Sequence, residues 1–369
     1  MRRSFIGLLG LLLAAAACGG TPTGHPSPPP SPTAVSVLAV VQHYDTSAQG
    51  AAVALVGLDG TVTARATFQP RQSPYVGNVA VMLQNEAQVG RAGVYYADGN
   101  GVVRLLEPSG KVTVVATFPM TPVQHELWYA VSPDGSRLLA GVLTMPDVVP
   151  AEPFPTLSGT WKFDLVSATA GGASTVLQHV ESAVGPDSPQ GSPLKPIFPI
   201  GWTQAGPVAM VGAPLATQNL WTGGPLYTID ATGRAATRIG GDDATSAAIL
   251  PTGILPAVTA QGARVTVRDS AGNVLWTPAV DGYNALSLKL SPAGDAITDG
   301  HHAVTREGPF RLPADYFAAG WVDATTVVGA SNQNGVAGDL TYLSSGDSAV
   351  TIHHLGVSGA FVGVVHPVA

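Results

Sequence analysis

The chain has 369 residues, of which 45% are hydrophobic and 11% are charged, and its formal net charge is −7. This hydrophobic fraction excludes a chain that is disordered throughout. With 17 Lys and Arg against 24 Asp and Glu, the protein also lacks the basic surface that nucleic-acid binding requires. We therefore expect a large folded domain that binds no nucleic acid.

The first eighteen residues, MRRSFIGLLGLLLAAAAC, have the organisation of an export signal: a basic start, an apolar core and a run of alanines. They end at Cys18, the only cysteine of the chain. The motif Ala15-Ala16-Ala17-Cys18 resembles the lipobox of bacterial lipoproteins, although that family usually has Leu where this chain has Ala15. The resemblance implies cleavage after residue 17, a diacylglyceryl group on Cys18, and attachment to the extracytoplasmic side of the cell membrane. The alternative is an ordinary cleaved signal.

Residues 18–34 form the second predicted segment, the lipidated cysteine followed by a stretch rich in Pro, Ser, Gly and Thr. Such a segment cannot bury a core and is expected to be extended. At about 3.1 Å per residue, residues 19–33 span roughly 45 Å. The sequence thus predicts a signal peptide at 1–17, a stalk at 18–34 and a globular domain at 35–369.

Two apolar stretches in the globular domain are interrupted in the same way, AVSPDGSRLLAG at 130–141 and KLSPAGDAITDG at 289–300. Pro sets φ for the second position of a turn, and Gly accepts the positive φ that reverses the chain. Both stretches therefore predict β-hairpins. Related turns occur at 204–206 and 251–253, with a degenerate copy at 323–325.

A second type of turn recurs between these hairpins, as in LVGLDGTVTARATF and RLLEPSGKVTVVATF. Two types of turn that alternate along the chain predict a seven-bladed β-propeller. Each blade has four strands, which we label a to d from the axis outward. No stretch has helical periodicity, and a β-sandwich is the competing all-β fold. The glycines of the second turn are Gly60, Gly110, Gly172, Gly233, Gly272, Gly308 and Gly346.

Strand order predicts how the ring closes. The domain opens with VSVLAVVQ, AAVALVGL and TVTARATF, which fit strands b, c and d without a preceding a strand. One strand is left over at the other end of the chain. We therefore expect Phe361–Val365 to supply strand a of the first blade and to remove an open sheet edge.

These turns and strands resemble the TolB-like and WD-repeat-like seven-bladed propellers of bacterial exported proteins, although the Trp-Asp dipeptide of WD repeats is absent. The resemblance implies the propeller fold over nearly the whole mature domain.

The candidate binding residues belong to the b–c and d–a connections, which share one face of a propeller. The long insertions at 144–160, 179–199 and 213–225 all fall in this set, and long loops on a rigid scaffold often carry function. We expect Phe154 and Trp221 to be aromatic anchors, or alternatively to pack over sheet edges as additional core. The d–a connections also carry His125 and a set of acids that could bind a divalent cation at the mouth of a central channel. These acids are Glu126, Asp242, Asp243, Asp281 and Asp315.

Catalytic motifs are missing, including the Gly-x-Ser-x-Gly elbow, His-Glu-x-x-His and the P-loop. The pairs His301-His302 and His353-His354 stand in strand-like stretches, where neighbouring side chains point to opposite faces. We therefore expect a non-catalytic, lipid-anchored module that binds an envelope protein, peptide or glycan. The alternative is a propeller hydrolase or lyase that uses carboxylates at the channel mouth. A quinoprotein-like oxidoreductase is a third class, but its tryptophan-docking repeats are not visible.

Overall fold

The computed structural model shows a β-protein whose described residues contain strands and turns and no helix. Within this described part, no helix is present that could cross a membrane. The described residues are 36–43, 50–70, 75–76, 79–80, 87–120, 125–149, 156–184, 197–211, 225–239, 244–247, 255–259, 265–269, 273–278, 288–331, 339–345 and 350–366.

The strands form seven four-stranded sheets and two short hairpins within the described residues. From the inner to the outer strand, the first three sheets are β32 (Ala360–Val365), β1 (Val37–His43), β2 (Ala51–Val56) and β3 (Val62–Phe68); β6 (Ala87–Gly90), β7 (Gly93–Ala97), β8 (Val102–Leu106) and β9 (Val112–Thr117); and β10 (His125–Val131), β11 (Arg137–Thr144), β14 (Thr160–Thr169) and β15 (Ser174–Ala183).

The next four sheets follow in chain order, and each consists of consecutive strands. They are β16 (Ile197–Thr203), β17 (Gly206–Val211), β18 (Leu226–Ile229) and β19 (Ala235–Ile239); β20 (Ala244–Ala247), β21 (Leu255–Thr259), β22 (Val265–Arg268) and β23 (Val274–Trp276); β24 (Lys289–Leu290), β25 (Ala296–Thr298), β26 (Ala303–Thr305) and β27 (Gly308–Pro309); and β28 (Phe317–Asp323), β29 (Thr326–Ala330), β30 (Asp339–Ser345) and β31 (Val350–Ser358). The hairpins are β4 (Tyr75–Val76) with β5 (Val79–Ala80), and β12 (Asp147–Val149) with β13 (Thr156–Ser158).

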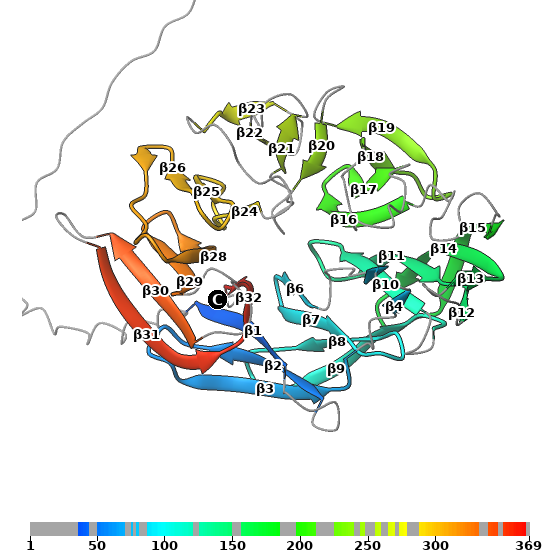
Figure 1. The fold of residues 1–369 in the computed structure, drawn as a ribbon, viewed down its shortest axis with the longest axis horizontal. Coiled ribbons are helices and arrows are strands. Elements are labelled where there is room, and N and C mark those ends of the chain that lie inside the picture. The colour runs from blue at the N-terminus through cyan, green and yellow to red at the C-terminus, as the bar shows by residue number, and fades with distance from the viewer. Residues whose placement is uncertain are drawn as a thin grey trace, which may run out of the picture. The chain divides into compact units, whose positions relative to one another are not determined.

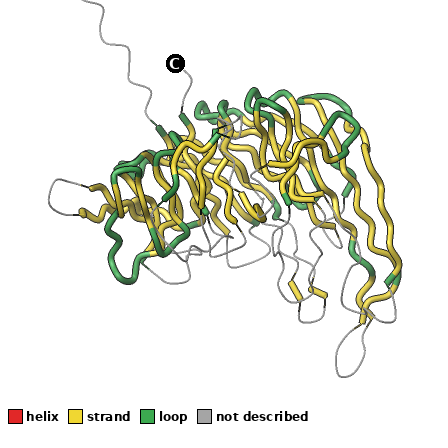
Figure 2. Tube along the Cα trace, turned by 90° about the horizontal axis from the view of Figure 1, so that it is seen from above, coloured by secondary structure: helices red, strands yellow, loops and turns green. Residues whose placement is uncertain are grey.

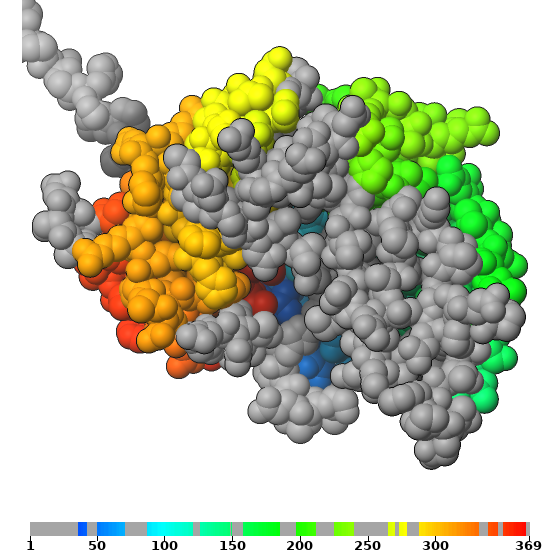
Figure 3. All heavy atoms as spheres, turned by 45° about the horizontal axis from the view of Figure 1, so that its top comes forward, coloured from blue at the N-terminus to red at the C-terminus, as the bar shows by residue number. Residues whose placement is uncertain are grey.

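The arrangement is an all-β β-propeller, as the alternating turns predict (Figure 1). Six of its blades each come from one continuous stretch of chain. The remaining four-stranded sheet is composite, because it joins β1, β2 and β3 to the last strand, β32. β1 pairs with β32 in antiparallel register from Val37 opposite Val365 to Val41 opposite Ala360, so the pairing predicted for Phe361–Val365 is confirmed. In Figure 3, blue atoms of the first strands lie beside red atoms of the last.

Strand β2 of the composite sheet is covered on both faces, and all six of its residues are buried. Val53 and Leu55 pack with Tyr96 of the sheet β6–β9. Ala54 and Val56 point to the opposite face and pack in a cluster with residues of the sheet β28–β31. Alternate residues of a strand point to opposite faces, so an uninterrupted apolar strand is the expected sequence at such a position.

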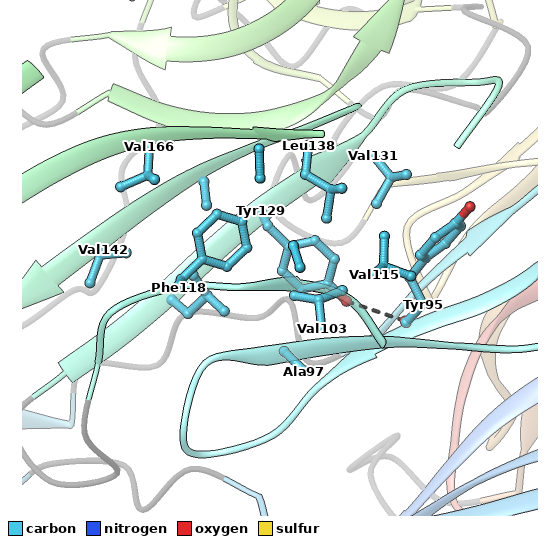
Figure 4. Close-up of a cluster of buried hydrophobic side chains, with 14 residues drawn as sticks. Tyr95, Ala97, Val103, Val115, Phe118, Tyr129, Val131, Leu138, Val142 and Val166 are labelled. Atoms are coloured by element: carbon cyan, nitrogen blue, oxygen red, sulfur yellow. Dashed lines mark hydrogen bonds between the residues drawn. The ribbon is translucent and has the colours of Figure 1, made fainter. Parts of the chain in front are cut away.

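The neighbouring interface, between the sheets β6–β9 and β10–β15, has the same character (Figure 4). Leu127, Tyr129 and Val131 alternate along β10 and pack against residues of β7, β8 and β9. The hydroxyl of Tyr129 is buried and donates a 3.2 Å hydrogen bond to the Tyr95 carbonyl. Burial of each large apolar side chain contributes roughly 1.5–3 kcal/mol, so these interfaces are the main source of stability.

The hairpin turns confirm the reading of the Ser-Pro-Asp-Gly motif. Ser132–Gly135 joins β10 to β11, the Gly135 amide donates to the Ser132 carbonyl at 2.8 Å, and Gly135 has a φ of 72°. Ser291–Gly294 repeats this turn between β24 and β25. In the second set of turns, Gly60, Gly110, Gly233 and Gly308 have positive φ as expected, but in the third sheet this residue is Gly171, not Gly172. The predicted turns at 251–253, Gly272 and Gly346 lie outside the described residues.

The two ends of the sheets differ. We call the end with the a–b and c–d turns the turn end, and the opposite end the connection end. Short described turns gather at the turn end (Figure 2). The connection end has the b–c and d–a connections, including 145–159, 184–196 and 212–225. The insertion predicted at 179–199 is therefore too long, because His179–Ala183 belongs to β15 and Ile197–Pro199 to β16.

Candidate functional site

Several predicted site residues lie outside the described residues: Cys18, Phe154, Trp221, Asp242, Asp243 and Asp281. Their roles remain predictions. The described ones are His125, Glu126 and Asp315.

His125 and Glu126 are the first residues of the inner strand β10, so the expectation that they lie in a connection is wrong. The reason is that β10 pairs with β11 along its whole length, with His125 opposite Thr144 and Glu126 opposite Leu143. Glu126 is fully buried and lies on the same side of β10 as Trp128, which packs against the core cluster shared with the next sheet. A buried carboxyl group on an inner strand is uncommon, since charged side chains are almost never fully buried unless paired.

Asp315 lies in the connection from β27 to β28, as predicted, and its side chain is exposed. The next residue, Tyr316, is buried, and its hydroxyl donates to the Thr341 carbonyl at 3.1 Å. Burial raises the pKa of Tyr316 to about 12. Tyr316 therefore fixes the end of this connection to the sheet β28–β31 that it enters, and leaves Asp315 in solvent.

The two histidine pairs differ in position. His353 and His354 belong to β31, as expected. His301 and His302 do not lie in a strand but in the turn from β25 to β26. The reason is the buried carboxylate of Asp299, whose Oδ1 accepts the amides of His301 and His302 at 3.0 and 2.7 Å. Neighbouring Asp-Gly is a turn signal that the strand reading passed over.

No three His, Cys, Asp or Glu side chains lie together in the described ranges in a way that could hold a metal ion. The proposed divalent cation therefore depends on acids outside those ranges.

A groove of about 540 Å³ lies between the composite sheet and the sheet β6–β9. We call it the β3 groove, because one wall consists of the last four residues of β3 and of Gln69, which follows the strand. Ala66, Phe68 and Tyr96 belong to the apolar cluster beneath it, and the Phe68 and Tyr96 rings have centroids 5.3 Å apart. The lining residues are Arg65, Ala66, Thr67, Phe68, Gln69, Tyr96, Asp98, Asn100, Arg104 and Val112.

The groove has an ion pair at its connection end. Asp98 begins the turn from β7 to β8, where its Oδ1 accepts the amides of Asn100 and Val102 at 3.0 Å each. Its Oδ2 accepts a 2.5 Å hydrogen bond from Nη1 of Arg104. The Asp98 side chain is 10% exposed and that of Arg104 28% exposed. The acid is thus enclosed, and the guanidinium has contact with solvent.

The same turn joins the two sheets, since the amide of Gly99 donates to the Gln69 carbonyl at 2.9 Å. Nearby, burial raises the pKa of Tyr96, and Asp98 adds to this shift while Arg104 opposes it. The sequence Asp98-Gly99-Asn100-Gly101 is typical of a hairpin turn, and these residues join β7 to β8. It gives no sign of the groove, because the wall contributed by β3 is some 30 residues away in the sequence.

Comparison with known proteins gives likeness of fold alone. No protein family model matches the chain, and no curated protein matches it. Solved structures resemble it, among them TolB from Acinetobacter baumannii, with 13% identity, a TM-score of 0.42, and coverage of 92% of this chain and 68% of that one. An oligogalacturonate lyase from Vibrio parahaemolyticus has 10% identity, a TM-score of 0.45, and coverage of 88% and 91%. The β-propeller domain of Cps50 (Swd1) from Myceliophteria thermophila has 12% identity, a TM-score of 0.39, and coverage of 79% and 89%.

Proposed function

We propose that this protein is a lipid-anchored, extracytoplasmic β-propeller that binds an envelope protein, peptide or glycan at its connection end. In this proposal Cys18 is the point of lipid attachment, and the composite sheet is the seventh blade of a closed ring. The contacts of β32 support the closed ring, because β32 lies against β28 of the last sheet and β6 of the next one.

The difference between the two ends carries the proposal. The described a–b and c–d turns are tight and closed by their own hydrogen bonds, as at Ser132–Gly135 and Glu107–Gly110. The connection end has the long segments 145–159, 184–196 and 212–225, and the turn at Asp98, which lines the β3 groove. Long connections on one end of a rigid scaffold are where binding residues are usually found.

The anchor is tested by Cys18→Ala. We expect this variant to leave the membrane fraction for the soluble fraction, because a lipid chain contributes about 0.8 kcal/mol per buried methylene. A variant that still sediments with membranes contradicts the lipid anchor.

Binding is tested with the full chain carrying Cys18→Ala as bait against detergent extracts of the envelope. Replacement of 184–196 by a Gly-Ser linker should abolish capture of partners identified by mass spectrometry. The matched control replaces the turn at 107–110 on the turn end, which should leave capture unchanged. Equal loss in both variants, or no loss in either, contradicts binding at the connection end.

A propeller hydrolase or lyase is the second candidate, favoured by the fully buried carboxyl group of Glu126. The test is turnover of envelope glycans and peptides by the wild type and by Glu126→Gln. Turnover that disappears in the variant supports an enzyme, whereas a variant that retains full activity excludes this residue as the acid.

A further inference from the structure

We propose that the β3 groove binds an extended peptide segment that carries an acidic side chain. This inference rests on the proposed binding function and adds a separate site, away from the connection 184–196, for one segment of the partner.

The backbone of β3 is the first observation. In the sheet order β3-β2-β1-β32, β3 is the outer strand and its partner is β2, so within the described part of the chain no strand pairs with its outward edge. Residues 65–69, the last four residues of β3 and the one that follows it, all line the groove. An extended peptide can add to such an edge through main-chain hydrogen bonds, while its alternate side chains enter the groove.

The surroundings of the groove suit an extended segment with β-branched or other apolar residues. Val112 lines the groove and is 44% exposed, and Val114 on the same strand is 52% exposed. Val62, on β3 itself, is 46% exposed. Apolar residues on neighbouring outer strands would be covered by a strand that docks beside them, as cross-strand pairs are within a sheet.

The charge of the groove selects an acidic side chain. Asp98 is enclosed and satisfied by two amides and Arg104, so the pair presents its cation, and not its anion, to solvent. A carboxylate that approaches the guanidinium makes a charge-assisted hydrogen bond. The amide side chains of Asn100 and Gln69, both exposed in the groove, can donate to the same carboxylate or to the peptide backbone.

The test uses phage-displayed random decapeptides, selected on the full chain carrying Cys18→Ala. We expect recovered sequences to contain Asp or Glu flanked by strand-forming residues and to lack Pro at the centre. A synthetic copy of the strongest one is then measured by fluorescence anisotropy, beside a copy with Gln or Asn in place of the acid. The acidic peptide should bind about tenfold more tightly.

Four variants separate the contribution of the apolar surface at Val112 from that of the Arg104 charge. Val112→Asp should weaken binding about tenfold by charge repulsion, whereas the matched Val274→Asp, at a 54% exposed valine of the outer strand β23, should leave it unchanged. Arg104→Gln should remove the preference for the acidic peptide, whereas Arg234→Gln should keep it. Equal effects of Val112→Asp and Val274→Asp, or an acidic preference that survives Arg104→Gln, would overturn the inference.

Two further outcomes identify the cause of a failure. If the selected peptides bind and the 184–196 replacement abolishes their binding, the site lies at the connections and the groove is excluded, while the proposed function stands. If no peptide is recovered but glucuronic acid binds to the wild type and not to Arg104→Gln, the groove takes a small anion and the peptide assignment is wrong.

Discussion

The turn end and the connection end of this propeller both use aspartate to reverse the chain, but in different ways. At the turn end, Asp134 is exposed and accepts hydrogen bonds from Ser132 and Ser136, all within one turn. At the connection end, Asp98 is buried, holds Arg104, and belongs to a turn that bonds to the neighbouring sheet. The first kind of turn is local, whereas the second depends on how two sheets meet.

The largest expected effect on stability comes from a substitution at the turn end. Gly135→Ala places a Cβ 2.3 Å from the Tyr95 hydroxyl at a φ of +72°. We expect a loss of about 2–3 kcal/mol in the free energy of unfolding, measured by urea denaturation, because both strain and a clash oppose the change. Gly110→Ala is the matched control, with a φ of +84° and nothing within 4 Å, and should cost about 1 kcal/mol. Equal losses would show that the contact with Tyr95 is unimportant.

The next effect concerns the connection end. Asp98→Asn keeps an oxygen for the amides of Asn100 and Val102 but removes the charge that pairs with Arg104. We expect a loss of about 1–2 kcal/mol in the free energy of unfolding, since a hydrogen bond to a charged group is weakened. Asp59→Asn, at an exposed turn aspartate, is the control and should change stability by less than 0.5 kcal/mol. A loss at Asp98 no larger than at Asp59 would mean that the ion pair adds nothing to the interface.

The two ends also differ in how well the sequence predicts them. The turn end follows from local rules, because Ser-Pro-Asp-Gly and its relatives specify a turn without reference to the rest of the chain. The pairing of β1 with β32 is predictable by counting strands. The turn at Asp299 also has a local signal, the pair Asp-Gly. The strand positions of His125 and Glu126 depend on pairing with β11, and the β3 groove depends on contacts between segments some 30 residues apart, so neither follows from local rules. The long connections are visible only as lengths of chain.

A smaller effect tests whether the turn end is sensitive to acid. The hydrogen bond from the Ser132 hydroxyl, followed by those from Ser136, lowers the pKa of Asp134 from 3.8 to about 2. The unfolded state thus binds more protons in this range, so the stabilisation is fully present above pH 3.8 and is lost as pH falls towards 2. Because Asp134 is exposed, solvent screening limits the effect to about 1 kcal/mol or less. Asp134→Asn should flatten this part of the pH–stability curve, and an unchanged slope would contradict the assignment.

The smallest effect lies on the outer strands, away from both sets of turns. His179 on β15 contacts Asp164 through Nδ1 at 2.6 Å and Glu181 through Nε2 at 3.0 Å, and these bonds, that to Asp164 first, raise its pKa above 6.5. A raised pKa stabilises the fold fully below pH 6.5 and loses this contribution as pH rises through the folded-state pKa. All partners are partly exposed, so we expect only about 0.3–0.5 kcal/mol. Thermal unfolding of the wild type and His179→Gln between pH 6 and 8.5 should converge at the alkaline end, where the imidazole is neutral in both the folded and the unfolded state. A difference that stays constant across this pH range would mean that His179 stabilises β15 by packing, and that its two carboxylates have no electrostatic effect on it.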